Sequence, residues 1–202
     1  MEIFFKVRDL IVASGNSHKV GEIKALLKGI PFSIFSLEKY PNVPEIEETG
    51  NTYQENALLK AVQVSNMTGC WALGDDTGLE VEAIGGQPGL YSARFAGEGV
   101  TFKENNDKLL GLLKDVPEEK RKANFYCVMA LAEPTGKTHV VEGKVSGRIS
   151  MDPRGEQGFG YDPLFFLPEL NKTFAEMNPA EKNKFSHRAR ALEKVREILL
   201  SI

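Results

Sequence analysis

Cysteine and histidine are scarce in this chain of 202 residues, and each scarcity removes a class of protein. The two cysteines, Cys70 and Cys127, lie in separate apolar runs, so we expect buried thiols in a reducing compartment and no disulfide framework. The sequence alone does not decide whether they pair. The histidines, His18, His139 and His187, are scattered, which disfavours a zinc site.

An excess of one charge is also missing, because Lys+Arg 25 against Asp+Glu 28 leaves a net charge of -3. Without a cationic field, neither duplex nucleic acid nor an anionic membrane is expected as the main partner, and a small ligand fits better. No apolar run approaches the roughly 20 residues that cross a bilayer, and charged residues interrupt the first nine positions. We therefore expect a cytoplasmic protein.

The composition that is present, 42% hydrophobic and 26% charged, is typical of one soluble domain, here residues 1–202. Hydrophobic periodicity predicts alternating strands and helices, followed by long strand candidates and a closing helix, which together indicate an α/β fold. Strands are expected at 10–13, 31–37, 71–73, 123–132, 137–149 and 161–167, and helices at 20–27, 53–67, after the capping pair Thr101 and Glu104, and after Asn178, with Leu109, Leu110, Leu112 and Leu113 facing the core. Whether Ser186 caps a separate last helix is open.

Charge is unevenly distributed along the chain. Between Tyr40 and Ala93 there are eight carboxylates and one base, Lys60, whereas basic residues outnumber acidic ones from Asn171 onward. An acidic patch beside a cationic one suits a triphosphate with a divalent ion, because carboxylates hold the cation and Lys or Arg bind phosphate oxygens. The alternative is that both are ordinary solvated helix faces.

A short polar turn, Ser14–Lys19, joins the first predicted strand to the first helix. Such a turn aims backbone N–H groups and the positive end of the helix dipole at one point, which favours an anion. Asn16 can donate from its amide and Lys19 adds charge, so a phosphate chain is the expected guest; the alternative is an ordinary strand-to-helix turn. The spacing is not that of a Walker loop.

Two pairs of acids are candidates for metal binding. Asp75 and Asp76 follow an apolar strand, and ligands of open α/β sheets gather at strand ends. Because adjacent residues of an extended chain point opposite ways, we expect only one of this pair in the site. Glu47 and Glu48 lie in a loop that could complete a Mg²⁺ shell, since Mg²⁺ often takes one or two protein carboxylates. The segment GDDTG that holds both aspartates is rich in turn-forming residues and is expected to be a turn after the strand; a simple Asx turn is the alternative role for one aspartate.

Glycines 155, 158 and 160 surround Phe159 and Tyr161, a combination that lets the backbone approach a ligand and offers a ring for a base to stack on. The alternative is that these aromatic residues belong to the core. Ser186, His187 and Arg188 could present hydrogen-bond donors at a helix start, or form a solvated helix face.

Five ordered blocks closely resemble the inosine triphosphate pyrophosphatase (Ham1) family: SGNSHKVGEI, EETGNTYQENALLKA, GDDTGLEVEAIGGQPGLYSARFAG, GFGYDPLFF and FSHRARAL. The resemblance runs from about Ile11 to Leu192. It implies an elongated mixed β-sheet with flanking helices, forming two lobes around a central substrate cleft. It also implies a homodimer that uses Mg²⁺ to hydrolyse ITP, dITP and XTP to the monophosphate and pyrophosphate.

The resemblance also implies roles for individual residues. Asp76 matches the catalytic aspartate, and Glu47 with Asp76 matches the metal ligands. The substrate-binding positions are Ser14, Gly15, Asn16, Ser17, His18, Lys19, Lys60, Thr77, Arg94, Phe159, Gly160, Tyr161, Asp162, Lys182, His187 and Arg188. Some relatives have Ser in place of Thr77, which keeps the hydroxyl.

Two other functions compete with this one. A Maf-like nucleotide pyrophosphatase has a similar architecture, but it opens with a Ser-Pro-Arg-Arg type of loop where this chain has Ser17-His18-Lys19. A nucleotide-binding regulator would bind ITP without releasing pyrophosphate, and the acids of the EETG and DDTG blocks argue against it. Pyrophosphate release separates the three.

Overall fold

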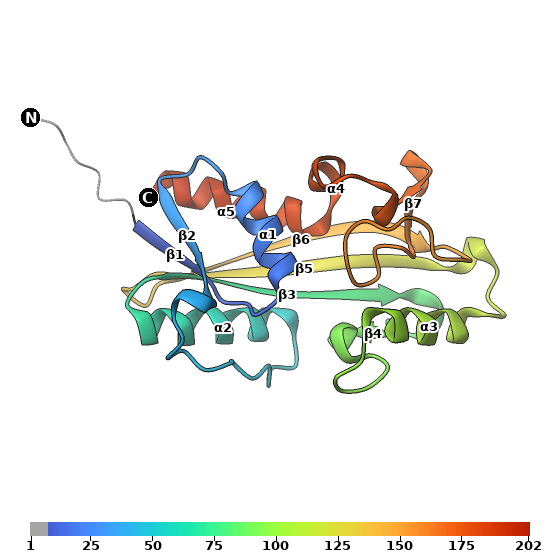
Figure 1. The fold of residues 1–202 in the computed structure, drawn as a ribbon, viewed down its shortest axis with the longest axis horizontal. Coiled ribbons are helices and arrows are strands. Elements are labelled where there is room, and N and C mark those ends of the chain that lie inside the picture. The colour runs from blue at the N-terminus through green and yellow to red at the C-terminus, as the bar shows by residue number, and fades with distance from the viewer. Residues whose placement is uncertain (1–7) are drawn as a thin grey trace, which may run out of the picture. The chain divides into compact units, whose positions relative to one another are not determined.

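An open, mixed β-sheet and five α-helices make up residues 8–202, the part of the chain that the computed structural model describes (Figure 1). The eight strands are β1 (Arg8–Val12), β2 (Phe32–Ser36), β3 (Trp71–Val81), β4 (Pro88–Gly89), β5 (Lys122–Ala132), β6 (Thr138–Ile149), β7 (Phe165–Leu167) and β8 (Lys172–Thr173). The helices are α1 (Ser17–Leu26), α2 (Tyr53–Thr68), α3 (Phe102–Leu113), α4 (Pro179–Phe185) and α5 (His187–Ser201). The strand order is β2-β1-β3-β5-β6-β7-β8, with β4 paired to β3. The predicted α/β fold is confirmed.

Two compact units divide the chain. Unit 1 contains the described residues up to Asp76 together with Val128–Glu142 and Ala191–Ile202, and unit 2 contains Thr77–Cys127 and Gly143–Arg190. The boundary falls inside β3, between two consecutive residues of the DDTG block.

Parallel pairing of β1 with β2 and β3 forms the centre of unit 1, with Val12 opposite Leu73 at the last pair of β1 and β3. The chain then turns into α1, whose first N–H groups are capped by Asn16: its Oδ1 accepts from the N–H groups of His18 and Lys19 at 3.0 and 3.1 Å. Figure 1 shows α1 and α2 on opposite sides of β1 and β3. Buried apolar residues of β1, α2 and β3 pack against one another in one core cluster.

Gly74 of β3 allows α2 to lie directly against the strand. A Cβ at this position would lie 2.1 Å from the carbonyl oxygen of Ala57. The close approach explains why a glycine stands in the middle of a buried strand. It also means that the sequence GDDTG, predicted as a turn, is the interior of β3, because packing against α2 overrides the low strand propensity of Gly and Asp.

Gly74→Ala is therefore expected to destabilise the protein by about 3 kcal/mol, the upper range of overpacking, because backbone atoms cannot move aside as a side chain can. Gly111→Ala is the matched control: it lies within α3, nothing surrounds it within 4 Å, and alanine there should stabilise by about 0.5–1 kcal/mol. Urea unfolding of both variants measures the difference. Equal effects of the two substitutions would contradict the packing argument.

Unit 2 has an aromatic core in which the rings of Phe125, Phe165 and Phe174 pack at centroid distances of 4.7–6.1 Å. The predicted capping box of Thr101 and Glu104 starts α3, and Leu109 and Leu113 are buried as expected. Leu112 is 47% exposed, so its predicted place in the core is wrong.

The predicted strand 161–167 begins only at Phe165, because the N–H groups of Leu164 and Phe165 both donate to the Tyr161 carbonyl and form a turn. Ser186 does cap a separate helix: its Oγ accepts from the N–H of Ala189 at 3.1 Å and α5 follows. Cys127 is buried as predicted, whereas Cys70 is half-buried. Within the described chain, every helix is too short or too polar to span a bilayer.

Candidate functional site

The predicted phosphate turn lies at the surface of unit 1, where β1 passes into α1. Gly15, Ser17 and His18 are exposed, and Ser14 Oγ accepts from the N–H of Asn16 at 3.2 Å. Asn16 is expected to donate from its amide to a ligand, and this stays a prediction; in the structure its Oδ1 accepts from the N–H groups of the first turn of α1. Its role in this turn is thus to shape the loop and cap the helix.

Asp75 and Asp76 point to different helices, as their adjacent positions on a strand predict. Asp75 Oδ1 lies 2.5 Å from the ammonium of Lys19 on α1, whereas Asp76 Oδ2 accepts from Asn56 Nδ2 on α2 at 3.0 Å. Both aspartates are buried, at 0% and 5% exposure. They lie inside β3, so the expectation that they end the strand is wrong. They do lie beyond its last pair with β1, next to the Ser14 turn.

The buried ammonium of Lys60 lies among three acidic residues of unit 1. Its Nζ donates to Glu48 Oε1 at 2.5 Å and to the carbonyl of Asp75 at 2.6 Å, and it lies 4.0 Å from Asp76 Oδ1. Glu48 therefore occupies the place beside Lys60. The predicted metal ligand Glu47 is exposed on the same loop.

The pKa of Asp76 is raised above its ordinary value, mainly because burial disfavours the charged form. The charge of Lys60 lowers this pKa, the charge of Glu48 raises it, and the Asn56 hydrogen bond and Lys19 lower it. A buried carboxyl that holds its proton more tightly than usual, in a polar cluster, is typical of a functional acid or base.

Asn56 is a site residue that the sequence predictions missed. Its Oδ1 accepts from the N–H of Gly50 at 2.8 Å while its Nδ2 donates to Asp76, so one buried side chain joins the loop of Glu47 and Glu48 to Asp76. The signal was present: Asn56 and Lys60 are spaced i, i+4 among the alanines of the buried face of α2. Polar residues on such a face are rare unless they are hydrogen-bonded.

Hard oxygen donors in this cluster suit Mg²⁺, which often takes one or two protein carboxylates together with phosphate oxygens. Within residues 8–202 there is no group of three or more His, Cys, Asp and Glu side chains arranged to hold a metal.

The glycine-rich loop of unit 2 is organised around a buried ion pair. Asp162 Oδ2 accepts from the ammonium of Lys182 at 2.6 Å and from the N–H of Phe159 at 2.8 Å. Both charged side chains are at most 5% exposed. A Cβ on Gly158, which has a φ of +76°, would lie 2.0 Å from the same Asp162 oxygen, so glycine is required there.

Two cations lie near the face of Phe159. The Lys182 ammonium is 4.8 Å and the Arg188 guanidinium carbon is 5.8 Å from its ring centroid. Arg188 also donates to Thr77 Oγ1 at 3.1 Å. The structure thus brings together Thr77, Phe159, Asp162, Lys182 and Arg188, which the sequence separates by as many as 111 positions.

His187 and Tyr161 belong to the core of unit 2. The His187 ring stacks on Phe125 with centroids 4.5 Å apart and planes at 14°, and the residue is 3% exposed. Tyr161 is also buried, its hydroxyl donates to the carbonyl of Ser92 at 2.9 Å, and burial raises its pKa. Of the two rings proposed as stacking platforms, Phe159 is the half-buried one.

Arg94 belongs to unit 2, whereas Lys19 and Lys60 belong to unit 1. Its Nε is 3.5 Å from Glu98, and its guanidinium faces the exposed ring of Tyr91 at 5.4 Å. With Lys108 it lines a hollow of about 510 Å³.

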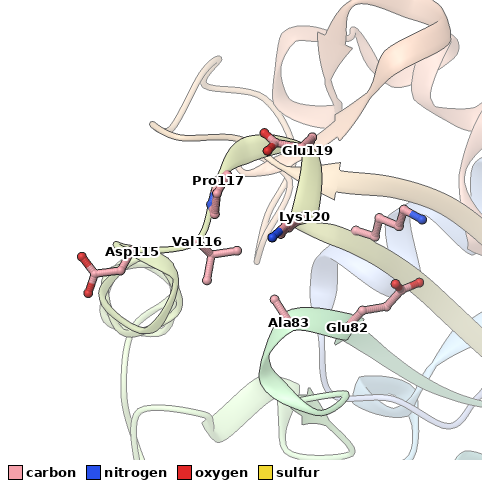
Figure 2. Close-up of a pocket in the computed structure, with 8 residues that line it drawn as sticks. Glu82, Ala83, Asp115, Val116, Pro117, Glu119 and Lys120 are labelled. Atoms are coloured by element: carbon pink, nitrogen blue, oxygen red, sulfur yellow. The ribbon is translucent and has the colours of Figure 1, made fainter.

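Another hollow, of about 540 Å³, contains none of the predicted site residues (Figure 2). Figure 2 shows Glu82 and Ala83 facing the segment from Asp115 to Lys120. Three carboxylates and two lysines line it, so its charges largely cancel. It has neither the buried acid nor the cation-faced ring found elsewhere.

The fold and these clusters define an α/β protein with a buried acid beside lysines in one unit and a cation-flanked aromatic ring in the other. The Ham1 family model matches residues 10–198. dITP/XTP pyrophosphatases of Desulforamulus reducens and Geobacter sulfurreducens are each 50% identical over 190 residues, covering 94% of this chain and 94% and 96% of theirs. A HAM1 protein from Coxiella burnetii, 39% identical, superposes with a TM-score of 0.88 over 96% of this chain and 100% of its own. The chain belongs to the Ham1 family.

Proposed function

We propose that this protein hydrolyses the non-standard purine nucleoside triphosphates ITP, dITP and XTP to the monophosphate and pyrophosphate. The observation that carries the proposal is the buried Asp76, held by Asn56 and lying 4.0 Å from Lys60, in the turn-and-strand setting expected of a phosphate site. The names of the relatives, dITP/XTP pyrophosphatase, support the substrate class. Residues 1–202 act in it as one pyrophosphatase domain.

In the proposed reaction, water attacks the α-phosphorus in line and pyrophosphate leaves. Asp76 orients the water or accepts its proton, a role suited to a carboxyl with a raised pKa. Lys19, Lys60 and Arg94 balance the charge that grows on the leaving oxygens. Glu47 and Asp76 would hold Mg²⁺, which when bound supplies Lewis-acid polarisation of the phosphate oxygens. The Ser14 turn supplies N–H groups near the end of β1.

Purine selectivity follows from the donors of unit 2. Hypoxanthine and xanthine present an oxo acceptor at position 6 and an N1–H donor, whereas adenine presents an amino donor and an N1 acceptor. Lys182 and Arg188, which flank the Phe159 ring, are donors only, so at position 6 they would pair with an oxo group and not with the amino group of adenine. Guanine shares the 6-oxo group, and its exclusion must depend on its 2-amino group.

A pyrophosphate-release assay with ITP, XTP, dITP, ATP and GTP, each with and without Mg²⁺, tests the proposal. We expect release from the first three only with Mg²⁺ and rates at least about 10²-fold lower for ATP, because its amino group meets donors. Binding of ITP without release would instead indicate a regulator. Release of pyrophosphate from ATP and GTP at the same rate as from ITP would contradict the assigned selectivity. The homodimer and the cytoplasmic location stay predictions, tested by light scattering and by cell fractionation.

A further inference from the structure

Two adjacent asparagines of α3 contact two different loops of unit 2. Asn105 Oδ1 accepts from the N–H of Ala96 at 2.7 Å, and its Nδ2 donates to the carbonyl of Ala93 at 3.1 Å. These two backbone groups lie on either side of Arg94. Asn105 is 2% exposed, so both bonds are sheltered from water and fix the backbone that carries Arg94.

Asn106 reaches the other loop. Its Nδ2 donates to the carbonyl of Gly160 at 3.0 Å, in the middle of the segment Phe159–Asp162. One turn earlier on the same helix, the ring of Phe102 lies 6.0 Å from that of Phe159. Helix α3 therefore contacts the glycine-rich loop at two consecutive points, both beside the ring flanked by Lys182 and Arg188.

A fourth hydrogen bond joins the two loops directly. The Tyr161 hydroxyl donates to the carbonyl of Ser92 at 2.9 Å, so the loop of Arg94 and the loop of Phe159 are bonded to each other as well as to α3. The glycine-rich loop is thus bonded to α3 and to the Arg94 segment, from which it is separated by 54 and 69 positions in sequence at these bonds. Side chains whose backbone is fixed in this way lose little freedom when a ligand binds.

The stability of the fold alone does not account for Asn106. The residue is 8% exposed, and its Oδ1 accepts no hydrogen bond from residues 8–202. A buried acceptor without a partner is unfavourable, and an apolar side chain of similar size would avoid that cost. A buried polar group without a partner calls for an explanation, and a functional role is such an explanation.

We propose that Asn106 positions the purine-recognition loop Phe159–Asp162 of unit 2 and sets the affinity for the base through the Gly160 carbonyl, while Asn105 positions the segment that carries Arg94. The inference rests on the proposed function in taking Phe159–Asp162 as the base site. Both asparagines are positioning residues, because each acts through a loop. Loss of Asn106 should weaken ligands that carry a purine and leave the bare phosphate chain unaffected.

Calorimetric binding of two probes in the presence of Mg²⁺ tests this on the full chain. Inosine monophosphate carries the base, and inorganic tripolyphosphate carries phosphates alone. Asn106→Asp keeps the size but loses the donor, and Asn106→Leu removes all polarity. Both variants should bind inosine monophosphate about tenfold more weakly, the loss expected for one hydrogen bond, and tripolyphosphate as the parent does. Asp107→Asn, next to Asn106 but exposed, is the control and should change neither constant.

Unchanged affinity of the variants for inosine monophosphate would overturn the inference, as would an equal weakening of both probes or a parent protein that does not bind inosine monophosphate. The result is distinguishable from failure of the proposed function. If the parent releases no pyrophosphate from ITP or XTP, the function is wrong, while the two binding constants still report on Asn106. Asn106→Leu keeps the test valid should the charge of Asn106→Asp prevent folding.

Discussion

Asp76→Asn is expected to lower pyrophosphate release from ITP by about 10³-fold or more, because an amide can neither accept a proton nor offer a charged metal ligand. The substitution keeps the size of the side chain and an oxygen that can accept from Asn56, so the fold should persist. Steady-state rates of the parent and variant at saturating substrate and Mg²⁺ measure the loss. Asp107→Asn makes the same chemical change at an exposed position of α3 and should keep full activity.

The same variant has a predictable effect on stability without metal. The folded protein holds the Asp76 proton more tightly than the unfolded chain, since the folded pKa is raised. Its contribution to stability is therefore lost as pH rises from the ordinary aspartate pKa of about 4 through the folded value. Urea unfolding at about pH 5 and pH 8 should show a smaller decline in the free energy of unfolding for Asp76→Asn than for the parent.

For activity, an Asp76→Asn protein with near-normal turnover would show that another carboxylate is the central one.

Lys182→Met should have the largest effect on stability and also weaken purine binding. It removes the ammonium 2.6 Å from Asp162 and leaves that carboxylate buried without its counter-charge, which costs about 3–5 kcal/mol. The free energy of unfolding in urea measures this loss. The double variant Lys182→Met/Asp162→Asn should recover most of it, because an amide oxygen can still accept from the N–H of Phe159.

Activity separates the two roles of this pair. The double variant should fold and still use ITP poorly, since the cation beside the Phe159 ring is gone. Lys103→Met provides the comparison, because its ion pair with Asp107 is exposed and screened by water, so its loss should change stability little. A double variant with full activity would remove Lys182 from base recognition.

The sequence predicted those parts of the fold that depend on local chemistry. Capping residues such as Thr101 and Asn178 and the periodic apolar face of α2 are local signals, and the helices they predict are present. The interior of β3 was mistaken for a turn because Gly74 is there for a contact that is distant in sequence. Ala57 of α2 packs so closely on the strand that no larger residue fits. Local propensity cannot register such a contact.

The candidate site was likewise predictable only in part. Motif resemblance predicted Asp76 and Lys182, and the structure surrounds each with charged and polar partners. It could not predict that Asp75 would pair with Lys19, or that Asn56 would join Gly50 to Asp76, because these contacts join residues of separate elements. His187 was predicted as a substrate-binding residue because its ring can donate hydrogen bonds. In the structure the ring stacks on Phe125, a contact that depends on the fold and has no local signal in the sequence.

The pairing of lysines with acids in unit 1 has a consequence for what the cluster attracts. With Asp76 ionised, the carboxylates Glu48, Asp75 and Asp76 outnumber the ammonium groups of Lys19 and Lys60 by one. A naked polyanion would meet repulsion there, whereas one that arrives already neutralised in part by a divalent counter-ion would not. Discrimination between these two species would thus begin at the encounter, before any bond is broken.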